Sequence, residues 1–261
     1  MTITQGWTEQ HVQVAGTSLQ IFRGGEGTPL LVFHGPEGNP GWTPYYNALA
    51  EHYRVLAPSH PGFNGSPRPA WLESIGHLAH FYHWFLDEQR LEHVHVLGFS
   101  MGGWLAAEMA LMCAHRLAKL VLVDAAGIKP REGEILDIFL HSSEQLAQLA
   151  CDDPSYVSQY GEWFGGTATP DLAQQNREMA VRLCWKPYMY NPALPALLPR
   201  LHLPTLIVWG REDRIVPANC GELYQQAIPG SVLKVIPGCG HMPHLERPQE
   251  FLQTVREFLG P

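Results

Sequence analysis

Short apolar runs rich in branched residues alternate with longer stretches of helical periodicity along most of this 261-residue chain. A strand, a helix and a second strand in succession form a parallel pair, because the helix carries the chain back across one face of the sheet. The sequence therefore predicts an α/β fold, with a mostly parallel twisted sheet and helices on both faces. The predicted strands lie at 11–14, 19–22, 30–34, 54–57, 93–97, 119–123, 205–209 and 232–236, and the helices between them at 44–52, 75–89, 101–115, 218–227 and 248–259.

The alternation stops after Asp124 and resumes near residue 201. The residues between have no β-branched run and hold two helical segments, 134–149 and 172–183, divided by Pro and Gly. Aromatic residues gather in this stretch, and most of them are expected to pack within it. We expect residues 127–200 to form a helical cap inserted into an α/β core of residues 1–126 and 201–261.

A nucleophile is predicted at Ser100, in the sequence GFSMGG at 98–103, between a predicted strand and a predicted helix. A turn this sharp needs small residues two positions on either side of its apex, which Gly98 and Gly102 supply. The serine Oγ is then exposed, and the helix that begins at Met101 directs its N-terminal amides toward it. A Gly-rich turn with an ordinary N-cap serine is the alternative.

A serine hydroxyl needs a neighbouring base, which is expected downstream on another loop. The last predicted strand runs into PGCGHMPH at 237–244, where two glycines precede His241 at the carboxyl edge of the sheet. His241 is therefore the expected base. His244 competes, but it follows Pro243 and is expected to cap or pack against the last helix.

The acid that orients the base is expected in the turn after the strand at 205–209, which reads GREDRIVP at 210–217. Asp213 can accept the Nδ1–H of His241, fixing its tautomer and stabilising the imidazolium. Asp124, at the end of an earlier strand, is an alternative position for the acid, and Glu212 is disfavoured. The alternative is that Asp213 only forms the turn, which is a common role of Asp in loops.

The oxyanion of the transition state needs two hydrogen-bond donors. The backbone N–H of Met101, directly after the nucleophile, is the expected first donor. The second is expected from the loop HGPEGNPGW at 34–42. Because Pro36 has no N–H, Glu37 is the favoured donor, with Gly38 as the alternative.

Composition excludes several other classes. The formal net charge is −8, from 17 basic and 25 acidic residues without a basic cluster, which argues against nucleic acid and anionic membranes as partners. The first ten residues have no signal-peptide pattern, and no apolar run approaches the length of a membrane span, so a cytoplasmic location is expected. The five widely spaced cysteines contain no CxxC pair, and the histidines at 77, 80 and 83 lack the further ligand of a metal site.

Together, these motifs resemble the α/β-hydrolase superfamily over nearly the whole chain. FHG at 33–35, GFSMGG at 98–103, GREDRIVP at 210–217 and GCGHMPHLERP at 238–248 occur in that family's order. The resemblance implies acyl transfer through an acyl-enzyme on Ser100, followed by deacylation by water that His241 activates, without a cofactor. The aromatic cap implies a small substrate with an apolar portion.

Within the superfamily, the motifs favour a carboxylesterase acting through a Ser-His-Asp triad. The second hypothesis is a hydrolase of C–C bonds in meta-cleavage products, or of lactones, with the same triad. The Gly/Pro-rich loop ending near Trp42 resembles the C–C hydrolases, but Phe99 and Met242-Pro243 stand where they carry other residues. A non-catalytic ligand-binding member of the fold is the remote alternative. No feature of the sequence demands a particular oligomeric state.

Overall fold

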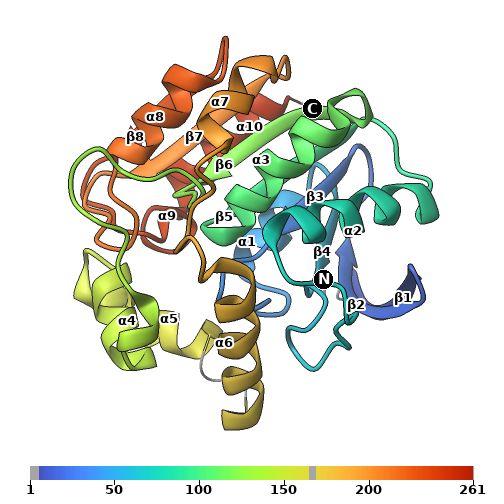
Figure 1. The fold of residues 1–261 in the computed structure, drawn as a ribbon, viewed down its shortest axis with the longest axis horizontal. Helices are drawn as coiled ribbons and strands as arrows, with labels where there is room; N and C mark the ends of the chain where they lie inside the picture. The colour runs from blue at the N-terminus through green and yellow to red at the C-terminus, as the bar shows by residue number, and fades with distance from the viewer. Residues whose placement is uncertain (1–5, 165–168, 261) are drawn as a thin grey trace, which may run out of the picture.

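The computed structural model describes residues 6–164 and 169–260 and contains one eight-stranded sheet with the order β1-β2-β4-β3-β5-β6-β7-β8 (Figure 1). The first three strands in this order are antiparallel neighbours, and every later pair is parallel. The predicted α/β class with a mostly parallel sheet is confirmed. The strands are β1 (Trp7–Val14), β2 (Thr17–Gly24), β3 (Pro29–Phe33), β4 (Arg54–Pro58), β5 (Val94–Phe99), β6 (Leu117–Val123), β7 (Thr205–Gly210) and β8 (Val232–Ile236).

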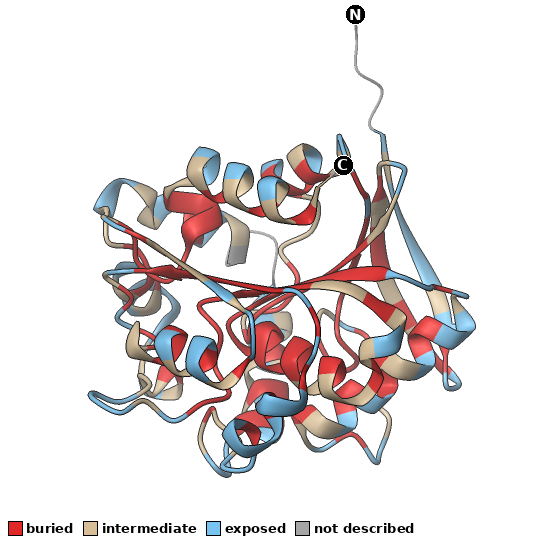
Figure 2. Ribbon diagram, turned by 90° about the horizontal axis from the view of Figure 1, so that it is seen from above, coloured by how far each residue is buried: buried red, intermediate tan, exposed pale blue. Residues whose placement is uncertain are grey.

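Helices cover both faces of this sheet, which Figure 2 shows nearly edge-on between two helical layers. The helices are α1 (Pro44–Ala50), α2 (Ile75–Glu88), α3 (Met101–Cys113), α4 (Ser143–Ala150), α5 (Val157–Phe164), α6 (Pro170–Cys184), α7 (Leu194–Leu197), α8 (Asn219–Ala227), α9 (Pro243–Glu246) and α10 (Pro248–Leu259). Short 3₁₀ helices lie at Ala114–Arg116, Ile138–Leu140, Pro154–Tyr156 and Leu198–Arg200.

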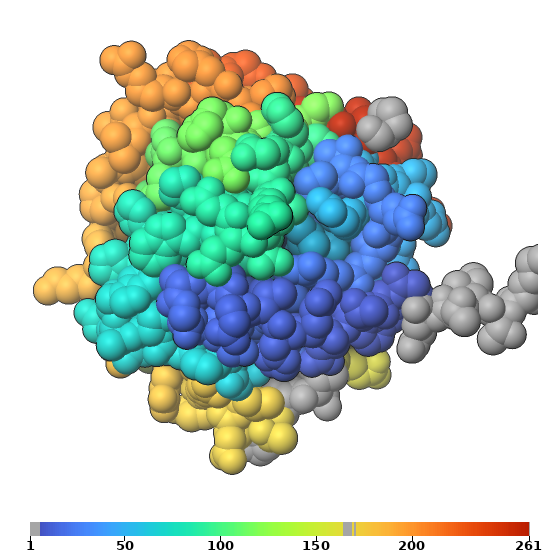
Figure 3. Space-filling view, turned by 90° about the vertical axis from the view of Figure 1, so that its right-hand side faces the viewer, coloured from blue at the N-terminus to red at the C-terminus, as the bar shows by residue number. Residues whose placement is uncertain are grey.

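Two apolar clusters, one on each face, hold the layers together. Helices α2, α3 and α8 pack in the first, and α1 and α10 pack in the second. Helix α10 shows the sequence cause, because Phe251, Val255 and Leu259 recur every four residues and so bury one face. In contrast, α3 is buried almost all round, as its apolar sequence requires. Figure 3 shows the first strands, β1 and β2, as a dark blue band across the face turned toward the viewer. The strand order puts β8 at the other edge of the sheet.

The segment between β6 and β7 contains no named strand among its described residues, and its α4, α5 and α6 lie off one edge of the sheet (Figure 1). The predicted helix at 134–149 is partly wrong, since the α-helix starts only at Ser143. A capping box formed by Ser142 and Gln145 fixes that start, and Asp137 caps a separate 3₁₀ turn before it. The predicted helix at 172–183 corresponds to α6.

The parallel strands bring distant parts of the chain to one edge of the sheet. Ser100 follows β5 directly, Asp124 follows β6 directly, Asp213 lies in the turn after β7 and His241 in the loop after β8. Carboxyl ends of parallel strands meet at the same edge, which is where open α/β sheets bind ligands. No helix in the described ranges is long and apolar enough to cross a membrane.

Candidate active site

Ser100 stands at a strained turn between β5 and α3. Its backbone has φ 52° and ψ −117°, a region that L-residues rarely adopt. A Cβ on Gly98 would lie 2.1 Å from the carbonyl oxygen of Gly102, and one on Gly102 would lie 2.5 Å from that of His34. The glycines flanking Ser100 are therefore required by the close approach of neighbouring backbone, and Ser100 itself is only 7% exposed.

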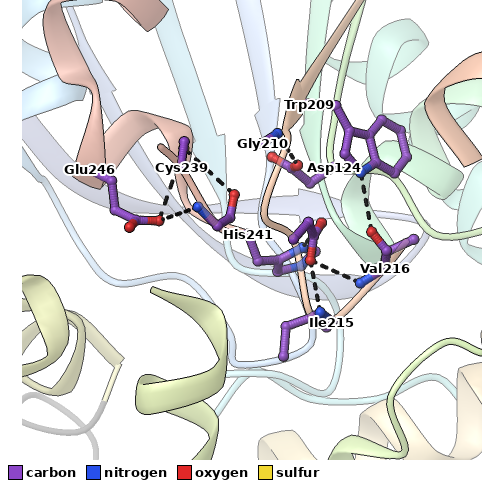
Figure 4. A network of polar contacts seen from close by, with 10 residues as sticks. Asp124, Trp209, Gly210, Ile215, Val216, Cys239, His241 and Glu246 are labelled. Atoms are coloured by element: carbon purple, nitrogen blue, oxygen red, sulfur yellow. Dashed lines mark hydrogen bonds and ion pairs between the residues drawn. The ribbon is translucent and has the colours of Figure 1, made fainter. Parts of the chain in front are cut away.

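His241 is held by an ion pair with Asp213, with 2.7 Å between Nδ1 and Oδ2. The other Asp213 oxygen, Oδ1, accepts hydrogen bonds from the N–H groups of Ile215 and Val216 at 2.8 and 3.0 Å (Figure 4). Both oxygens of Asp213 thus act as hydrogen-bond acceptors, for three donors in all. The structure brings Asp213, rather than Asp124, to His241, and Glu212 instead accepts from the N–H of Cys239 at 3.0 Å.

Opposing effects set the pKa of His241. Burial lowers it, but the Asp213 carboxylate raises it through its charge and hydrogen bond, and Glu37 and Glu246 add to this. The net effect is a pKa above the ordinary value of 6.5. A histidine in such a setting accepts a proton readily, which is what a general base beside a serine requires.

Glu246 of α9 fixes the loop that carries His241, and the sequence did not single it out. Its Oε1 accepts from the N–H of Gly240 at 2.8 Å (Figure 4). Its Oε2 accepts from the N–H groups of Asp152 and Asp153 at 2.7 and 3.0 Å. The N–H of His241 itself donates to Ala150 O at 2.7 Å. The end of α4 and the histidine loop are thereby joined through one buried carboxyl group.

His244 packs rather than reaches the triad, as expected. Its ring lies 4.2 Å from that of Phe99 and 4.8 Å from that of Tyr45, centroid to centroid. Burial lowers the pKa of His244 to about 3, so the ring is neutral. Its contact with Phe99, the residue before Ser100, gives His244 a packing role beside Ser100.

The loop after β3 lies over Ser100. Gly38 donates its N–H to Gly35 O at 3.3 Å, so it is engaged within the loop. The Glu37 N–H faces that residue's own carboxyl group. Glu37 also lines the small cavity beside Ser100. A Cβ on Gly35 would lie 3.5 Å from Ser100 Cβ and 2.7 Å from Glu37 Oε2, which places the Glu37 side chain beside Ser100.

Three asparagines hold this loop, and the sequence pointed to none of them. Asn176 of α6 donates from Nδ2 to Glu37 O at 2.8 Å and accepts from Asn64 N at 2.7 Å. Asn64 and Asn39 exchange two further bonds, Asn39 N to Asn64 Oδ1 at 2.9 Å and Asn64 Nδ2 to Asn39 O at 2.9 Å. Asn residues in Gly/Pro-rich loops were the only sequence signal, and nothing in the sequence pairs residue 64 with residue 176.

Two buried histidines, His34 and His60, support the loop after β3. His34 Nε2 accepts from His60 N at 2.9 Å, and His60 Nδ1 lies 2.6 Å from Tyr82 Oη. Burial lowers the pKa of His34 to about 3, and burial followed by the neighbouring His34 lowers that of His60. Both rings are therefore neutral parts of the scaffold.

Two cavities meet at Glu37. A small one of about 20 Å³ is bordered by Ser100, His241, Met242 and Glu37, and holds about one water molecule. A larger one of about 810 Å³ lies among α4, α5 and α6 and has Glu37 and Arg177 on its wall. Tyr160, on the wall of the larger cavity, donates to Glu37 Oε1 at 3.3 Å, so the Glu37 side chain lies between the larger cavity and the small one that borders Ser100.

One described set of side chains has donor atoms close enough together for a metal ion, namely Asp124, Asp213 and His241, within 4.8 Å of one another. Backbone N–H groups of Gly210, Ile215 and Val216 point at these carboxyl oxygens. These donors occupy Asp124 Oδ1 and Asp213 Oδ1, and His241 binds Asp213 Oδ2. Because these oxygens are already engaged, we interpret the set as a hydrogen-bond network.

A family model described as the alpha/beta hydrolase fold matches residues 28–248. The chain belongs to this family, and it is a hydrolase. The 2-hydroxy-6-oxo-6-phenylhexa-2,4-dienoate hydrolase of Burkholderia cepacia is 27% identical over 241 residues, which cover 84% of this chain and 83% of the relative. The pimeloyl-[acyl-carrier protein] methyl ester esterase of Aeromonas hydrophila is 28% identical over 242 residues, covering 84% and 90%. The solved structure of a meta-cleavage product hydrolase from Pseudomonas fluorescens is similar with a TM-score of 0.82 and 26% identity, covering 96% of this chain and 97% of that one.

Proposed function

We propose that this chain cleaves a bond next to a carbonyl group, with Ser100 as nucleophile, His241 as proton carrier and Asp213 as the acid that orients His241. The 2.7 Å ion pair between His241 and Asp213, in a loop that borders the same small cavity as Ser100, is the observation that carries this proposal. The N–H groups of Met101 and Glu37 are the proposed oxyanion donors. Gly38 N–H is bound to the backbone at Gly35 O, whereas the Glu37 N–H faces its own side-chain carboxyl group, which a substrate oxygen can replace; this favours Glu37 over Gly38.

For the substrate, we propose a carbon–carbon bond in a compound of the meta-cleavage type, a small acyl dienoate with one carboxylate. This puts the second expectation from the sequence ahead of the carboxylic ester. It is supported by relatives that are named as hydrolases of 2-hydroxy-6-oxo-6-phenylhexa-2,4-dienoate and that match more than four-fifths of the chain. Arg177 supports it further, because this residue lines the large cavity. Its guanidinium donates to the carbonyl oxygens of Phe139 and His141 and has further N–H groups that can pair with a substrate carboxylate.

In this proposal, Ser100 Oγ attacks the ketone carbon while His241 takes its proton. The bond to the dienoate portion then breaks, its electron pair stays on the dienoate carbon, and His241 returns the proton to that carbon. Water, deprotonated by His241, releases the acyl group from Ser100 as a carboxylic acid. In both steps the negative oxygen is stabilised by the two backbone donors, each worth about 10²–10³ in turnover.

A carboxylic ester is the second candidate. The similarity to the Aeromonas hydrophila esterase supports it, as do Phe99 and Met242-Pro243, where the sequence departs from the C–C hydrolases. The same triad and oxyanion donors serve ester cleavage, with an alcohol in place of the dienoate carbon as leaving group.

We further propose that residues 127–200 act as a cap over a core of residues 1–126 and 201–261. Helices α4, α5 and α6 line the large cavity, which supports a role of this segment in substrate selection. A small acyl substrate with an apolar portion and a cytoplasmic location remain predictions from the sequence.

The test is steady-state turnover of 2-hydroxy-6-oxo-6-phenylhexa-2,4-dienoate and of p-nitrophenyl butyrate by the wild type, Ser100→Ala and Arg177→Gln. We expect Ser100→Ala to abolish turnover of both. Arg177→Gln should lower kcat/KM for the dienoate about tenfold or more relative to the neutral ester, since only the dienoate loses an ion pair. Turnover of the ester alone would support the second candidate, and turnover surviving in Ser100→Ala would contradict the assignment of the nucleophile.

A further inference from the structure

Asp124 is a buried carboxyl group that the proposed triad does not use. It directly follows β6, is 1% exposed and has a positive φ of 45°. Its Oδ1 accepts one hydrogen bond, from Gly210 N at 2.8 Å, whereas Oδ2 is buried and finds no donor among the described residues. A buried carboxylate oxygen without a donor is costly, which requires an explanation.

The group that faces Asp124 is a second carboxyl, that of Asp213. Oxygen atoms of both residues lie within 4.8 Å of each other and of a ring nitrogen of His241. Two buried carboxyls this close do not both ionise, so one of them keeps a proton. The question is which residue holds it.

The hydrogen bonds decide the position of the proton. Asp213 accepts hydrogen bonds from three donors, His241, Ile215 and Val216, so both of its oxygens already act as acceptors. Asp124 accepts only the N–H of Gly210. Burial, and then the negative charge of Asp213, raise the pKa of Asp124 well above its ordinary value. The proton therefore belongs on Asp124.

We propose that Asp124 is a protonated positioning residue whose Oδ2–H donates a hydrogen bond to the Asp213 carboxylate, so that the triad is extended to Ser-His-Asp-Asp. The catalytic consequence rests on the function proposed above, but the proton on Asp124 does not. The Asp124 carboxyl group thereby gives its buried Oδ2 a hydrogen-bond partner and holds Asp213 toward His241. It also ties the end of β6 to Gly210, at the end of β7.

Other titratable groups face this cluster from the packed elements around it. Each of them contributes to the local field, so a test must change Asp124 alone. They are Glu246 and His244 from α9, Glu37 from the loop after β3, Cys239 from the loop after β8 and Cys220 from α8.

Asp124→Asn separates a neutral from an ionised Asp124. The asparagine can accept from Gly210 through Oδ1 and donate to Asp213 through Nδ2, which reproduces the protonated acid. We expect the acid limb of the kcat/KM profile against pH to stay within about 0.3 unit of the wild type. A downward shift of about one unit or more would overturn the proposal, because it would mean that a negative charge beside His241 had been removed.

Asp124→Ala completes the kinetic test, since it removes the donor to Asp213. We expect kcat to fall by about tenfold or more with KM nearly unchanged, because the loss acts on the orientation of His241 rather than on substrate binding. A kcat equal to that of the wild type would overturn the positioning role.

Infrared difference spectra test the proton without any turnover. Wild type minus Asp124→Asn should show, at neutral pH, the C=O stretching band of a protonated carboxyl group. Asp171→Asn, an exposed control on α6, should show none. Absence of the band would refute a proton on Asp124 even if the enzyme is active. Its presence in a protein inactive on every substrate would uphold the proton and reject the proposed function instead.

Discussion

Asn176 donates a hydrogen bond to the carbonyl oxygen of Glu37 at 2.8 Å, across 139 residues of sequence. Through it, helix α6 holds the loop that carries a proposed oxyanion donor. The buried Asn176 amide therefore connects helix α6, which lines the large cavity, to the loop that lies over Ser100.

Asn176→Ala should reduce both stability and turnover. It leaves Glu37 O and Asn64 N without their partner, at a cost of about 1–3 kcal/mol in the free energy of unfolding. We expect kcat to fall more than KM rises, because the misplaced donor acts in the transition state. Chemical denaturation and steady-state kinetics measure the two effects. Glu178→Ala, an exposed position on the same helix, is the control, and equal effects of both variants would argue against the link.

Gly102→Ala should prevent the strained turn at Ser100. Its Cβ would stand 2.5 Å from the carbonyl oxygens of Phe33 and His34, and backbone cannot yield cheaply there. We expect a loss of about 3 kcal/mol or more in the free energy of unfolding. Gly161→Ala on α5 is the matched control, since no heavy atom lies within 4 Å of its Cβ and Ala is the better helix former. Thermal unfolding measures the stability of both variants. A small loss of stability in Gly102→Ala would show that the turn is not constrained as described.

Replacement of Glu246 by Gln should loosen the histidine loop. The carboxyl group accepts three backbone N–H bonds, and a Gln amide would turn its own N–H₂ toward at least one of these donors. We expect a loss of about 1–3 kcal/mol in stability together with lower turnover. Glu250→Gln removes an exposed ion pair with Lys234, 2.9 Å long, and should change stability by less than about 1 kcal/mol. Similar losses in both variants would contradict this role of Glu246.

The pH dependence follows from the raised pKa of His241. The base must be neutral to accept the Ser100 proton, so kcat/KM should fall as pH decreases through a value above 6.5. Asp213→Asn should move this limb to lower pH, since the charge that raises the pKa of His241 is removed, and should lower kcat by roughly 10⁴. A limb unmoved by that substitution would mean that another group titrates.

The ion pair between His241 and Asp213 also makes the stability of the fold depend on pH, with the opposite sign, because its contribution falls as pH rises. A histidine whose pKa is higher folded than unfolded stabilises the fold fully below the unfolded value, and this stabilisation is lost as pH rises through the folded value. The wild type should therefore lose more stability than Asp213→Asn does when pH is raised from below 6.5 to above the His241 pKa. Denaturation midpoints at several pH values measure this difference, and parallel curves would exclude it.

The sequence predicted residues that local patterns mark. Ser100, His241 and Asp213 each lie in a short Gly-containing turn after a strand, so strand order alone brings them to one edge of the sheet. Glu246 and Asn176 could not be found in this way, because their partners are backbone groups that only the tertiary fold places nearby. The start of α4 was missed for a local reason, since the capping box at Ser142 outweighs the helical periodicity before it.

Asp124 shows a different limit of prediction from the sequence. Sequence alone placed it in competition with Asp213 for the same role, since both follow strands at the same edge. The structure gives the contact with His241 to Asp213 and leaves Asp124 behind it. Which of two nearby carboxyls faces a histidine depends on turn geometry that spacing does not specify.

The central claim is that Ser100 is the nucleophile, and covalent labelling tests it most directly. We expect a fluorophosphonate to inactivate the wild type and to leave one adduct, which peptide mass mapping locates on Ser100. His241→Ala should react much more slowly, and Ser100→Ala should not react at all. An adduct on another residue, or equal labelling of Ser100→Ala, would contradict the assignment of the nucleophile.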